Sequence, residues 1–561
     1  MVLSNEKEWV IKEPIPMVIQ EELNEYPKIV QQLLYNRGIL NQEQAKEYLT
    51  HTINHDPFLF SQMDRAVEII LQKIKNNEKI AVYGDYDVDG ITATALLSQV
   101  LVSQQADVWP YIPNRFDEGY GVNTNALDSL AEAGVKLLIT VDCGIRSPEE
   151  LNYAKKLGMQ VIITDHHAPS EVIPNVDAII CQHLNDLYPD KFLSGVGLAY
   201  KLAQAIFLKQ GKAIELADEW LDLAALGTVA DVVPLMGENR RIVKIGLSRI
   251  RLAKRLGLSA LIRASNLRLG EFSSTNISFG IAPRLNAAGR LETPQLALDL
   301  LMTEDINQAA VLAQRLDDLN RERQKITRDM QVKAEEMINP ENLLLFAVDP
   351  DFSSGLVGLV AAKLTEFYYR PSIIAYQGEK YTRASCRSIQ EFNITQALDE
   401  CEDLLVQHGG HAMAAGFTVE NDKLDILKQK LIKIAYRELS KIDLRPVISA
   451  DMVIPLEEIP ADILPQLDHL EPIGSENPQA VFVSKGVQVV RSKAVGKDES
   501  HLKLTLKGNQ SSVYDAIAFH HGHWSKVLPK NIDIVYTIER NFFNGNIYTQ
   551  LNIRDIKSSK N

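Results

Sequence analysis

The chain has 561 residues, of which 45% are hydrophobic and 24% charged, and its formal net charge is −14 at pH 7. This length exceeds what one hydrophobic core supports, so we expect roughly three to four domains of a soluble globular protein. The sequence excludes a membrane-spanning protein, because no apolar run reaches the ~18 residues of a transmembrane helix. The negative charge argues weakly against nucleic acid as a partner, and four cysteines without a CxxC pair fit a reducing cytoplasm.

The first 55 residues are polar and predicted to be helical, and we find no pattern there that indicates a site. From residue 79 onward, short apolar runs alternate with helical patterns. Strands are predicted at 79–83, 108–112, 136–141, 160–164 and 178–181, and helices at 91–102, 123–133 and 148–157. Strands separated by helices form βαβ units, so we expect a mostly parallel sheet covered by helices.

Acidic residues and histidines follow the apolar runs. Three strand ends and one further apolar segment (226–230) deliver them: Asp85, Asp87 and Asp89; Asp142; Asp165, His166 and His167; and Asp231. Each acid alone is more often a helix cap. However, parallel strands bring their carboxyl ends to one edge of the sheet, and independent caps have no reason to gather there. Carboxylates with imidazole and no thiolate suit Mn²⁺ well and Mg²⁺ acceptably, so we predict a divalent metal site.

These residues resemble the four motifs of the DHH phosphoesterase superfamily, whose members bind two Mn²⁺ or Mg²⁺ ions and hydrolyse phosphodiesters or phosphoanhydrides. Within that superfamily the chain is most similar to the RecJ family of bacterial single-strand-specific 5′→3′ DNA exonucleases. The narrower resemblance rests on longer motifs at 83–90, 113–115 with 119–121, 230–235, 283–290, 409–417 and 471–478. It extends from about residue 50 to the C-terminus, and this ordered set is far more specific than the DHH tripeptide.

Two alternatives share parts of the pattern. A family II inorganic pyrophosphatase or a small-nucleotide phosphodiesterase would carry the same metal motifs. These enzymes usually have a histidine four residues before the first aspartate of the DxD pair, where this chain has Tyr83. A non-catalytic DNA-binding scaffold of the same superfamily would have eroded motifs, whereas every ligand position is filled here.

The region after the predicted sheet is basic. It contains Arg249, Arg251, Lys254, Arg255, Arg263 and Arg268. A local basic surface binds phosphates even in an acidic protein, and the alternative is a solvated helix face paired with acids elsewhere. Residues 304–338 have helical periodicity with many i,i+4 charge pairs, and we predict one long connector helix there.

A second α/β unit is predicted from residue 343, with strands at 343–348 and 371–376 and a helix opened by the segment 354–358. This unit resembles the DHHA1 domain. The resemblance places Ser385, Arg387 and His411 in loops that face the metal site across a cleft, which admits a single strand and excludes a duplex. Arg284 and Arg290 are expected to flank a glycine-containing loop, with Arg387 in the facing domain.

From residue 449 onward, five short strands are predicted at 480–490, 502–506, 513–519, 534–538 and 547–553, which fits a small barrel of OB type. OB barrels commonly bind single strands through aromatic and basic side chains. The candidates are Tyr514, Phe519, Trp524, Tyr536, Phe542, Phe543 and Tyr548, with Arg491, Lys493, Lys497, Lys503 and Lys507. Most of the aromatic residues equally suit the barrel core.

The predicted fold class is therefore α/β, with two α/β domains (DHH and DHHA1) joined by a long helix and a C-terminal OB-type β-barrel. The expected domains are an N-terminal helical segment (1–55), the DHH catalytic domain (56–245), a basic helical region with the connector helix (246–338), the DHHA1 domain (339–446) and the OB-fold nucleic-acid-binding domain (447–561).

The resemblance implies a cytoplasmic enzyme that releases nucleoside 5′-monophosphates from single-stranded DNA by two-metal hydrolysis, in DNA repair and recombination. The implied metal ligands are Asp87, Asp89, Asp142, His166 and Asp231, with Mn²⁺ preferred and Mg²⁺ accepted. Asp85 would bind metal or orient a neighbour, and His167 and His411 would act on the phosphoryl group. Arg115, Arg284, Arg290, Ser385 and Arg387 would hold the 5′ end. The resemblance also suggests a single-strand-binding protein and a helicase as partners, and no membrane.

Overall fold

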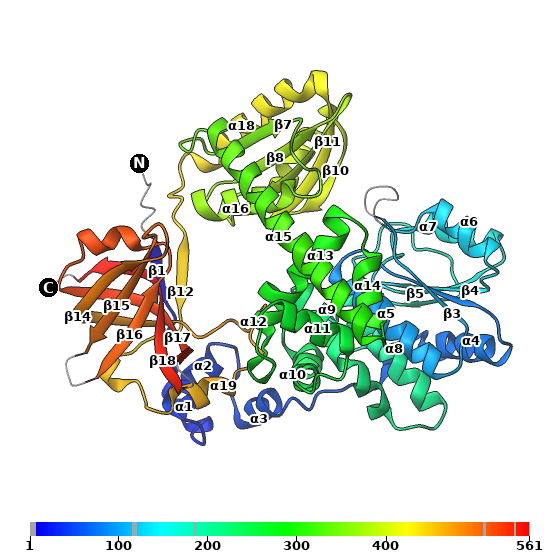
Figure 1. The fold of residues 1–561 in the computed structure, drawn as a ribbon, viewed down its shortest axis with the longest axis horizontal. Coiled ribbons are helices and arrows are strands. Elements are labelled where there is room, and N and C mark those ends of the chain that lie inside the picture. Colours follow the sequence, from blue (N-terminus) through cyan, green and yellow to red (C-terminus); the bar gives the residue numbers. More distant parts are fainter. Residues whose placement is uncertain (1–6, 115–120, 185–186, 509–511, 544–545, 560–561) are drawn as a thin grey trace. The chain divides into compact units, whose positions relative to one another are not determined.

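The computed structural model describes residues 7–114, 121–184, 187–508, 512–543 and 546–559 (Figure 1). The chain divides into two compact units. The larger unit comprises Lys7–Ala282, Leu298–Ala309 and Val447–Asn561, and the smaller unit comprises Pro283–Ala297 and Ala310–Pro446. Within the described ranges, no helix combines the length and the apolar character needed to cross a membrane.

A five-stranded parallel sheet forms the first half of the larger unit, in the order β3-β2-β4-β5-β6. Its strands are β2 (Ile80–Tyr83), β3 (Val108–Tyr111), β4 (Leu137–Val141), β5 (Gln160–Thr164) and β6 (Ala178–Ile180). Helices α6 (Thr124–Glu132) and α7 (Pro148–Lys156) pack on one face, and α5 (Val88–Ser103) and α8 (Gly195–Lys209) lie on the other (Figure 1). The parallel sheet and its intervening helices are confirmed.

Helices supply the rest of this half. They are α4 (Met63–Lys75), α9 (Leu221–Ala230), α10 (Gly237–Arg251), α11 (Leu256–Ala264) and α12 (Ser274–Asn276). The apolar segment 226–230 is the last part of α9, and most of α9 is buried between its neighbours. Asp231 therefore follows a buried helix and reaches the sheet edge from a different direction than the strand-end residues.

A closed barrel forms the second half of the larger unit. Its strands are β14 (Phe482–Val495), β15 (His501–Lys507), β16 (Val513–Ala518), β17 (Asn531–Phe543) and β18 (Asn546–Ser558). Pairing of β14 with β17 and of β16 with β18 closes it, and the prediction of an OB-type barrel is confirmed. The short β13 (Met452–Val453) pairs with β14.

The N-terminal segment packs on this barrel. Helices α1 (Met17–Glu22), α2 (Lys28–Tyr35) and α3 (Gln42–Thr50) share one hydrophobic core with the barrel and α19 (Ile463–Asp468). Before them, β1 (Glu8–Ile11) pairs in parallel with β12 (Val447–Ala450). The strand β1 was not predicted, because its pairing partner lies more than four hundred residues further along the chain.

The smaller unit contains a five-stranded mixed sheet in the order β10-β11-β9-β8-β7. Its strands are β7 (Leu345–Asp349), β8 (Ser372–Gln377), β9 (Tyr381–Arg387), β10 (Leu405–His411) and β11 (Ala414–Glu420). Helix α16 (Val357–Tyr368) and the end of α15 (Ile306–Met337) pack in one core, and α17 (Ile394–Asp399) and α18 (Leu424–Leu439) pack in another. The predicted long helix at 304–338 is confirmed by α15, which belongs to this unit from Ala310 onward.

The prediction of a glycine-containing loop between Arg284 and Arg290 was wrong. These residues lie on helix α13 (Ala282–Leu291), which is followed by α14 (Gln295–Met302). Buried Leu285, Ala287 and Ala288 favour a helix, and this outweighs the cost of one glycine. Both arginines also belong to the same compact unit as Arg387 and not to a facing domain.

Candidate metal centre

Seven of the predicted site residues lie together at the carboxyl edge of the parallel sheet. They form three overlapping groups: Asp142, His166 and His167; Asp89, His166 and Asp231; and Asp85, Asp87 and Asp142. Within each group the candidate ligand atoms lie within 4.8 Å of one another. Residues that are far apart in the sequence therefore lie close together at this edge, as the parallel strands predict.

The first turn of α5 positions Asp87 and Asp89. The Asp87 side chain accepts hydrogen bonds from the backbone amides of Asp89 and Gly90, at 2.9 and 3.1 Å, and so caps the helix as well as facing the cluster. The Asp89 carboxylate is only 1% exposed. It accepts hydrogen bonds from the amides of Gly195 (2.6 Å) and Val196 (2.9 Å) at the start of α8.

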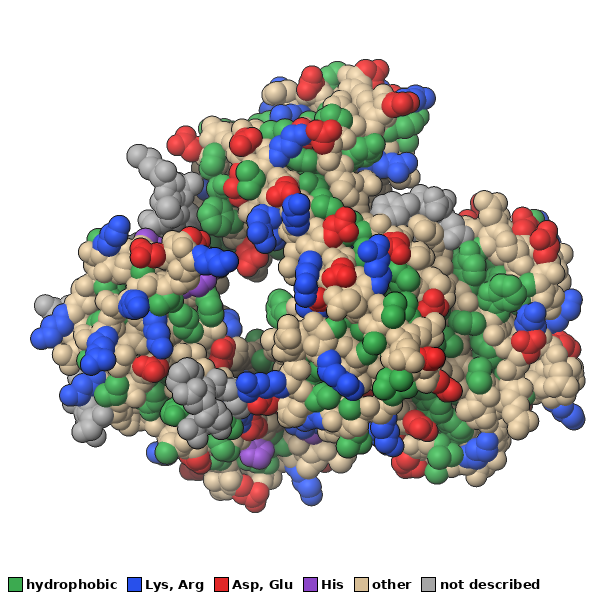
Figure 2. Space-filling model, in the orientation of Figure 1, with side chains coloured by type: hydrophobic (Ala, Val, Ile, Leu, Met, Phe, Trp, Pro, Cys, Tyr) green, Lys and Arg blue, Asp and Glu red, His purple; other side chains and the backbone are tan. Residues whose placement is uncertain are grey.

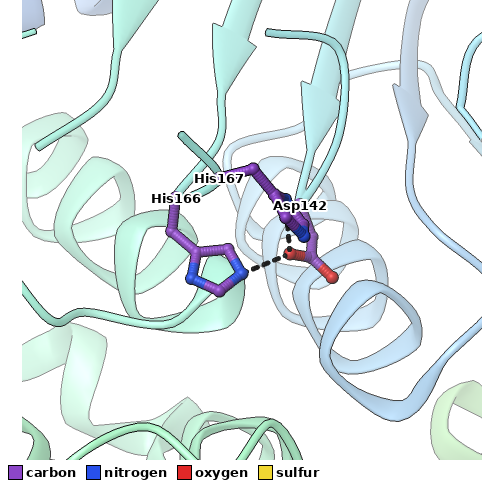
Figure 3. Close-up of side chains that lie close together, drawn as sticks. All are labelled: Asp142, His166 and His167. Carbon is purple, nitrogen blue, oxygen red and sulfur yellow. Dashed lines mark ion pairs between the residues drawn. The ribbon is translucent and has the colours of Figure 1, made fainter. Parts of the chain in front are cut away.

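Asp142 has an unusual backbone. Its φ of 61° lies in the left-handed region, which is costly for a residue with a side chain and tends to occur at functional sites. This turn directs the carboxylate toward the histidines from the end of β4 (Figure 3). A β-carbon on Gly195 would lie 2.5 Å from the Asp142 β-carbon, so only glycine fits beside it.

His166 lies at the centre of the cluster. Its Nε2 atom is 3.1 Å from Asp142 Oδ1 (Figure 3). The same atom is 3.6 Å from Asp231 Oδ2 and 4.0 Å from Asp89 Oδ2. His166 Nε2 and Asp142 Oδ1 are both buried, and neither has a hydrogen-bond partner among the described residues. Buried polar atoms that point at one another without a hydrogen bond are what a cation between them would satisfy.

Burial and mutual repulsion shift the pKa values of the cluster. Burial and the Asp87 charge raise the pKa of Asp89 to about 7, and burial with Asp89 and Asp87 raises the pKa of Asp231 to about 9. Burial and the surrounding aspartates raise the pKa of Asp142 well above its usual range. Burial lowers the pKa of His166 to about 4, so this imidazole is neutral and available as a ligand. Oxygen donors with one neutral imidazole fit Mn²⁺ or Mg²⁺.

His167 differs from His166 in its partner. Its Nδ1 lies 2.8 Å from Asp165 Oδ1, and buried Asp165 also accepts from the amide of Ile145 at 2.9 Å. Burial lowers the pKa of His167, but the hydrogen bond and the charge of Asp165 outweigh it and raise this pKa overall. The Asp165 pKa is lowered, because the hydrogen bond and charge of His167 overcome the effect of burial. Asp165 therefore orients a histidine that tends to be protonated.

Two neighbouring residues supply no ligand. Burial and nearby carboxylates raise the pKa of Cys143 well above its usual value, so the thiol stays protonated and packs in the core. Tyr83 is buried on the α6–α7 face of the sheet, where its hydroxyl donates to the Gly121 carbonyl and accepts from Asn123.

The sequence-based interpretation missed three contributors. Gly195 and Gly227 leave the space that the carboxylates occupy, since a β-carbon on Gly227 would lie 2.6 Å from Asp89 Oδ1. Asp165 was noted in its motif but given no role. The signal for α8 was the run Ser194-Gly195-Val196-Gly197, in which a serine cap is followed by two glycines in the first turn of an apolar helix.

The remaining predicted residues lie in the smaller unit or outside the described residues. Arg115 falls in the segment 115–120, which the structure does not describe. Ser385 and Arg387 were expected in a loop but belong to the end of β9, where they share one face, and the Arg387 Nη1 donates to Ser385 Oγ at 3.1 Å. His411 was likewise expected in a loop, and it is the exposed last residue of β10. It pairs with Ala414 of β11, and Ala414 pairs on its other side with Arg387 of β9.

The start of α16 gathers three of these side chains. Arg290 donates to the Gly355 carbonyl at 3.0 Å, just before the helix begins. A β-carbon on Gly358 would lie 3.0 Å from Ser385 Oγ and 3.3 Å from Arg387 Nη2. Arg284, by contrast, is held on α13 by buried Asp317, with 2.8 Å between Nε and Oδ1.

Several side chains of the basic stretch at residues 249–268 have partners within the protein. Arg255 pairs with Asp222, Arg251 donates to the Phe272 carbonyl, and Arg268 pairs with Glu271. The alternative of a helix face paired with acids therefore accounts for Arg255 and Arg268, and Arg251 is used by a backbone carbonyl.

The barrel carries a different basic surface. Arg491, Lys493 and Lys503 are exposed on β14 and β15, and Lys493 and Lys503 are directly opposite in register. Figure 2 shows several Lys and Arg side chains over the barrel. Of the aromatic candidates, Tyr536 is core, whereas Phe519 and Tyr548 are about half exposed.

Comparison with known proteins gives the family. Residues 79–228 match the DHH family N-terminal domain, 341–437 the DHHA1 domain and 450–555 the RecJ OB domain. The single-stranded-DNA-specific exonuclease RecJ of Bacillus subtilis is 39% identical over 100% of this chain and 72% of its own length. The chain belongs to the RecJ family.

Solved RecJ structures agree with this assignment. RecJ from Thermus thermophilus in complex with Mn²⁺ has a TM-score of 0.87 and 29% identity, covering 100% of this chain and 81% of that one. The Mg²⁺ complex of RecJ from the same organism has a TM-score of 0.81 and 28% identity, covering 99% and 79%. The RecJ match along the whole chain excludes the pyrophosphatase and scaffold alternatives.

Proposed function

We propose that this chain degrades single-stranded DNA from the 5′ end, and that the cluster at the sheet edge holds the divalent metal ions of the reaction. As a member of the RecJ family it is a metal-dependent exonuclease specific for single-stranded DNA. The observation that carries the metal proposal is the gathering of four strand-end and helix-end segments around buried, unsatisfied His166 Nε2 and Asp142 Oδ1.

Asp87, Asp89, Asp142, His166 and Asp231 would hold two ions, with Mn²⁺ preferred and Mg²⁺ accepted. Such ions, when bound, supply a hydroxide from water near neutral pH and stabilise the charge that develops on a phosphoryl group. The protein's own part is to position the ligands. The α8 amides orient Asp89, the left-handed turn orients Asp142, and Asp85, beside Asp87 and Asp142, completes the acidic side of the cluster.

His167 would contact the scissile phosphate. The Asp165 carboxylate fixes its ring through Nδ1 and raises its pKa, which leaves Nε2 as a donor for a phosphoryl oxygen. In the smaller unit, His411 is a further candidate donor to a phosphoryl oxygen. Its exposure at the end of β10 is compatible with contact to a ligand.

The 5′ end would be held by Arg284, Arg290, Ser385 and Arg387, with Arg115 as a further candidate. Guanidinium groups bind a terminal phosphate through two parallel hydrogen bonds, and a terminal phosphate carries more charge than an internal diester. Support comes from Arg290, Ser385 and Arg387, which border the start of α16: Arg290 donates to the Gly355 carbonyl, and Ser385 and Arg387 lie close to Gly358.

The barrel would bind the strand away from the reacting end. Like charges directly opposite on neighbouring strands repel one another. Lys493 and Lys503 are placed in this way on the exposed face, and a DNA phosphate would relieve their repulsion. We also propose a cytoplasmic location, a role in DNA repair and recombination, and association with a single-strand-binding protein and a helicase, because single strands arise where such proteins act.

Product analysis tests this function. The purified chain should convert a single-stranded oligonucleotide to nucleoside 5′-monophosphates in Mn²⁺, and leave a blunt duplex of the same sequence intact. Addition of EDTA should stop the reaction. Cleavage of the duplex at a similar rate, or release of internal fragments, would contradict the proposal.

A further inference from the structure

Arg323 is a half-buried arginine on α15 that none of the motifs singled out. Its Nη2 donates to the Oδ1 atom of Asn320 at 2.9 Å, one turn earlier on the same helix. Because Asn320 is buried, with 2% of its surface exposed, its side chain holds the Arg323 guanidinium in one orientation. The Arg323 Nε is buried and has no hydrogen-bond partner among the described residues. An arginine held in place with an unused donor is prepared for an acceptor that a ligand supplies.

Other arginines lie around the segment of α15 that carries Arg323. Asp317, also on α15 and N-terminal to Arg323, is 1% exposed and accepts from the Arg284 Nε. The same carboxylate pairs with the exposed Arg321. Burial lowers the pKa of Arg323, and the positive charge of Arg284 lowers it further. The charges of Arg284 and Arg323 thus oppose one another, and buried Asp317 pairs with Arg284 and with Arg321.

This arrangement differs from an ordinary structural arginine. Arg240, for comparison, is 2% exposed, and its guanidinium donates to five backbone carbonyls, those of Tyr48, His469, Leu470, Glu471 and Pro472. A buried guanidinium with a packing role has its donors satisfied in this way. Among the described residues, the Arg323 guanidinium donates to one acceptor, the uncharged Asn320, and has Arg284 as a cationic neighbour, so an anion would suit this environment.

We propose that Arg323 and Arg284 together bind one phosphate, the terminal 5′-phosphate of the DNA strand. The inference rests on the proposed function and adds a residue to it. A terminal phosphate carries about two negative charges near neutral pH, against one for an internal diester. Two guanidinium groups neutralise that dianion, and buried Asp317 and Asn320 on adjacent turns of α15 hold them at a fixed spacing.

The first test removes the charge of Arg323. In Arg323→Gln, the rate on 5′-phosphorylated strands should fall about tenfold, while the rate on 5′-hydroxyl strands stays nearly constant. The logarithmic salt dependence of binding to the phosphorylated strand should weaken by about 0.7, the value for one lost phosphate contact on a single strand. Arg328→Gln is the matched control, since Arg328 is exposed on the same helix, and it should change neither quantity.

The second test keeps Arg323 and places a carboxylate from the protein itself next to it. Asn320→Asp preserves the acceptor position and places a carboxylate on Arg323, so it should reduce the preference for 5′-phosphorylated strands without lowering the melting temperature. Arg323→Lys should recover only part of the preference, because lysine keeps the charge and loses the two-donor geometry.

An unchanged preference in both Arg323→Gln and Asn320→Asp, with native melting, would overturn the inference. Equal losses on phosphorylated and hydroxyl strands would do the same, because they would indicate an internal phosphate contact. If Arg387→Ala still removes the preference in that case, the proposed function stands and only the role of Arg323 is wrong.

Discussion

The backbone amide of Gly195 donates a 2.6 Å hydrogen bond to the carboxylate of Asp89. This bond joins the first turn of α8 to the first turn of α5, two segments more than one hundred residues apart. Gly195 also lies against Asp142, with no space for a β-carbon. The amides at a helix N-terminus favour a negative charge, so α8 holds Asp89 in the position where a metal ligand is needed.

A side chain at position 195 should therefore damage the metal centre. Gly195→Ala would place a methyl group within 2.6 Å of the Asp142 carboxylate and displace it. We expect the affinity for Mn²⁺, measured by calorimetry, to fall at least about tenfold. Gly197→Ala is the control, because its β-carbon would make ordinary contacts starting at 3.4 Å. Equal affinities in the two variants would show that the Gly195 contact does not position the ligands.

Loss of the Asp89 charge should stop the reaction without unfolding the protein. In Asp89→Asn one oxygen remains to accept from α8, whereas the negative charge that binds metal is gone. Turnover in excess Mn²⁺ should fall on the order of a thousandfold, with an unchanged circular dichroism spectrum. The exposed Asp64, paired with Lys209 on the surface, provides the control Asp64→Asn. Turnover near the wild-type value in Asp89→Asn would refute Asp89 as a ligand.

The stability of the metal-free protein should fall as the pH rises. Asp89 and Asp231 have folded-state pKa values raised to about 7 and about 9, while in the unfolded chain both lie near 4. At pH values between the unfolded and folded pKa values, the folded state binds more protons than the unfolded state, so the folded state loses stability as the pH rises. Melting in EDTA from about pH 5 to pH 9 should show the decline, and the stabilisation by added Mg²⁺ should grow over the same range.

Asp231→Asn separates this effect from general alkaline instability. The variant should lose the upper part of the decline, between about pH 7 and pH 9, because Asp231 is the group that titrates there. Asp64→Asn should leave the curve as it is. A wild-type melting temperature that is constant across the range in EDTA would contradict the raised pKa values.

The paired lysines of the barrel should affect binding and not chemistry. Exchange of both Lys493 and Lys503 for glutamine should weaken binding to a long single strand on the order of tenfold, with a smaller salt dependence. Turnover at saturating DNA should stay within about twofold of the wild type. Lys526 and Lys530 are exposed elsewhere on the barrel, and their double exchange is the control. A large fall in saturating turnover would mean that the barrel face takes part in the reaction.

The sequence predicted those features that depend on local pattern and on the geometry of parallel sheets. Strands β2, β4 and β5 are short apolar runs with acids directly after them, and parallel topology brings such ends together wherever they lie in the chain. The convergence of Asp85, Asp142 and His166 therefore follows from pattern alone. The long helix α15 and the barrel strands were also predictable, because each has a regular local sequence pattern.

Other features depend on contacts between distant segments. The left-handed φ of Asp142 and the fit of Gly195 beside it have no local signal. The N-terminal helices share their core with a barrel that begins more than four hundred residues later, so their polar sequence gave no indication of a partner. The segment between Arg284 and Arg290 was predicted to contain a glycine loop, and the burial of Ala287 and Ala288 favours the helix α13 instead.

Digestion of one single-stranded oligonucleotide, labelled at either end, tests the central claim most directly. With Mn²⁺ present, the 5′ label should appear at once as a mononucleotide, while the 3′ label remains on strands that shorten progressively. Without metal, both labels should stay on the full-length strand. Early release of the 3′ label as a mononucleotide, or equal digestion in EDTA, would contradict a metal-dependent exonuclease that acts from the 5′ end.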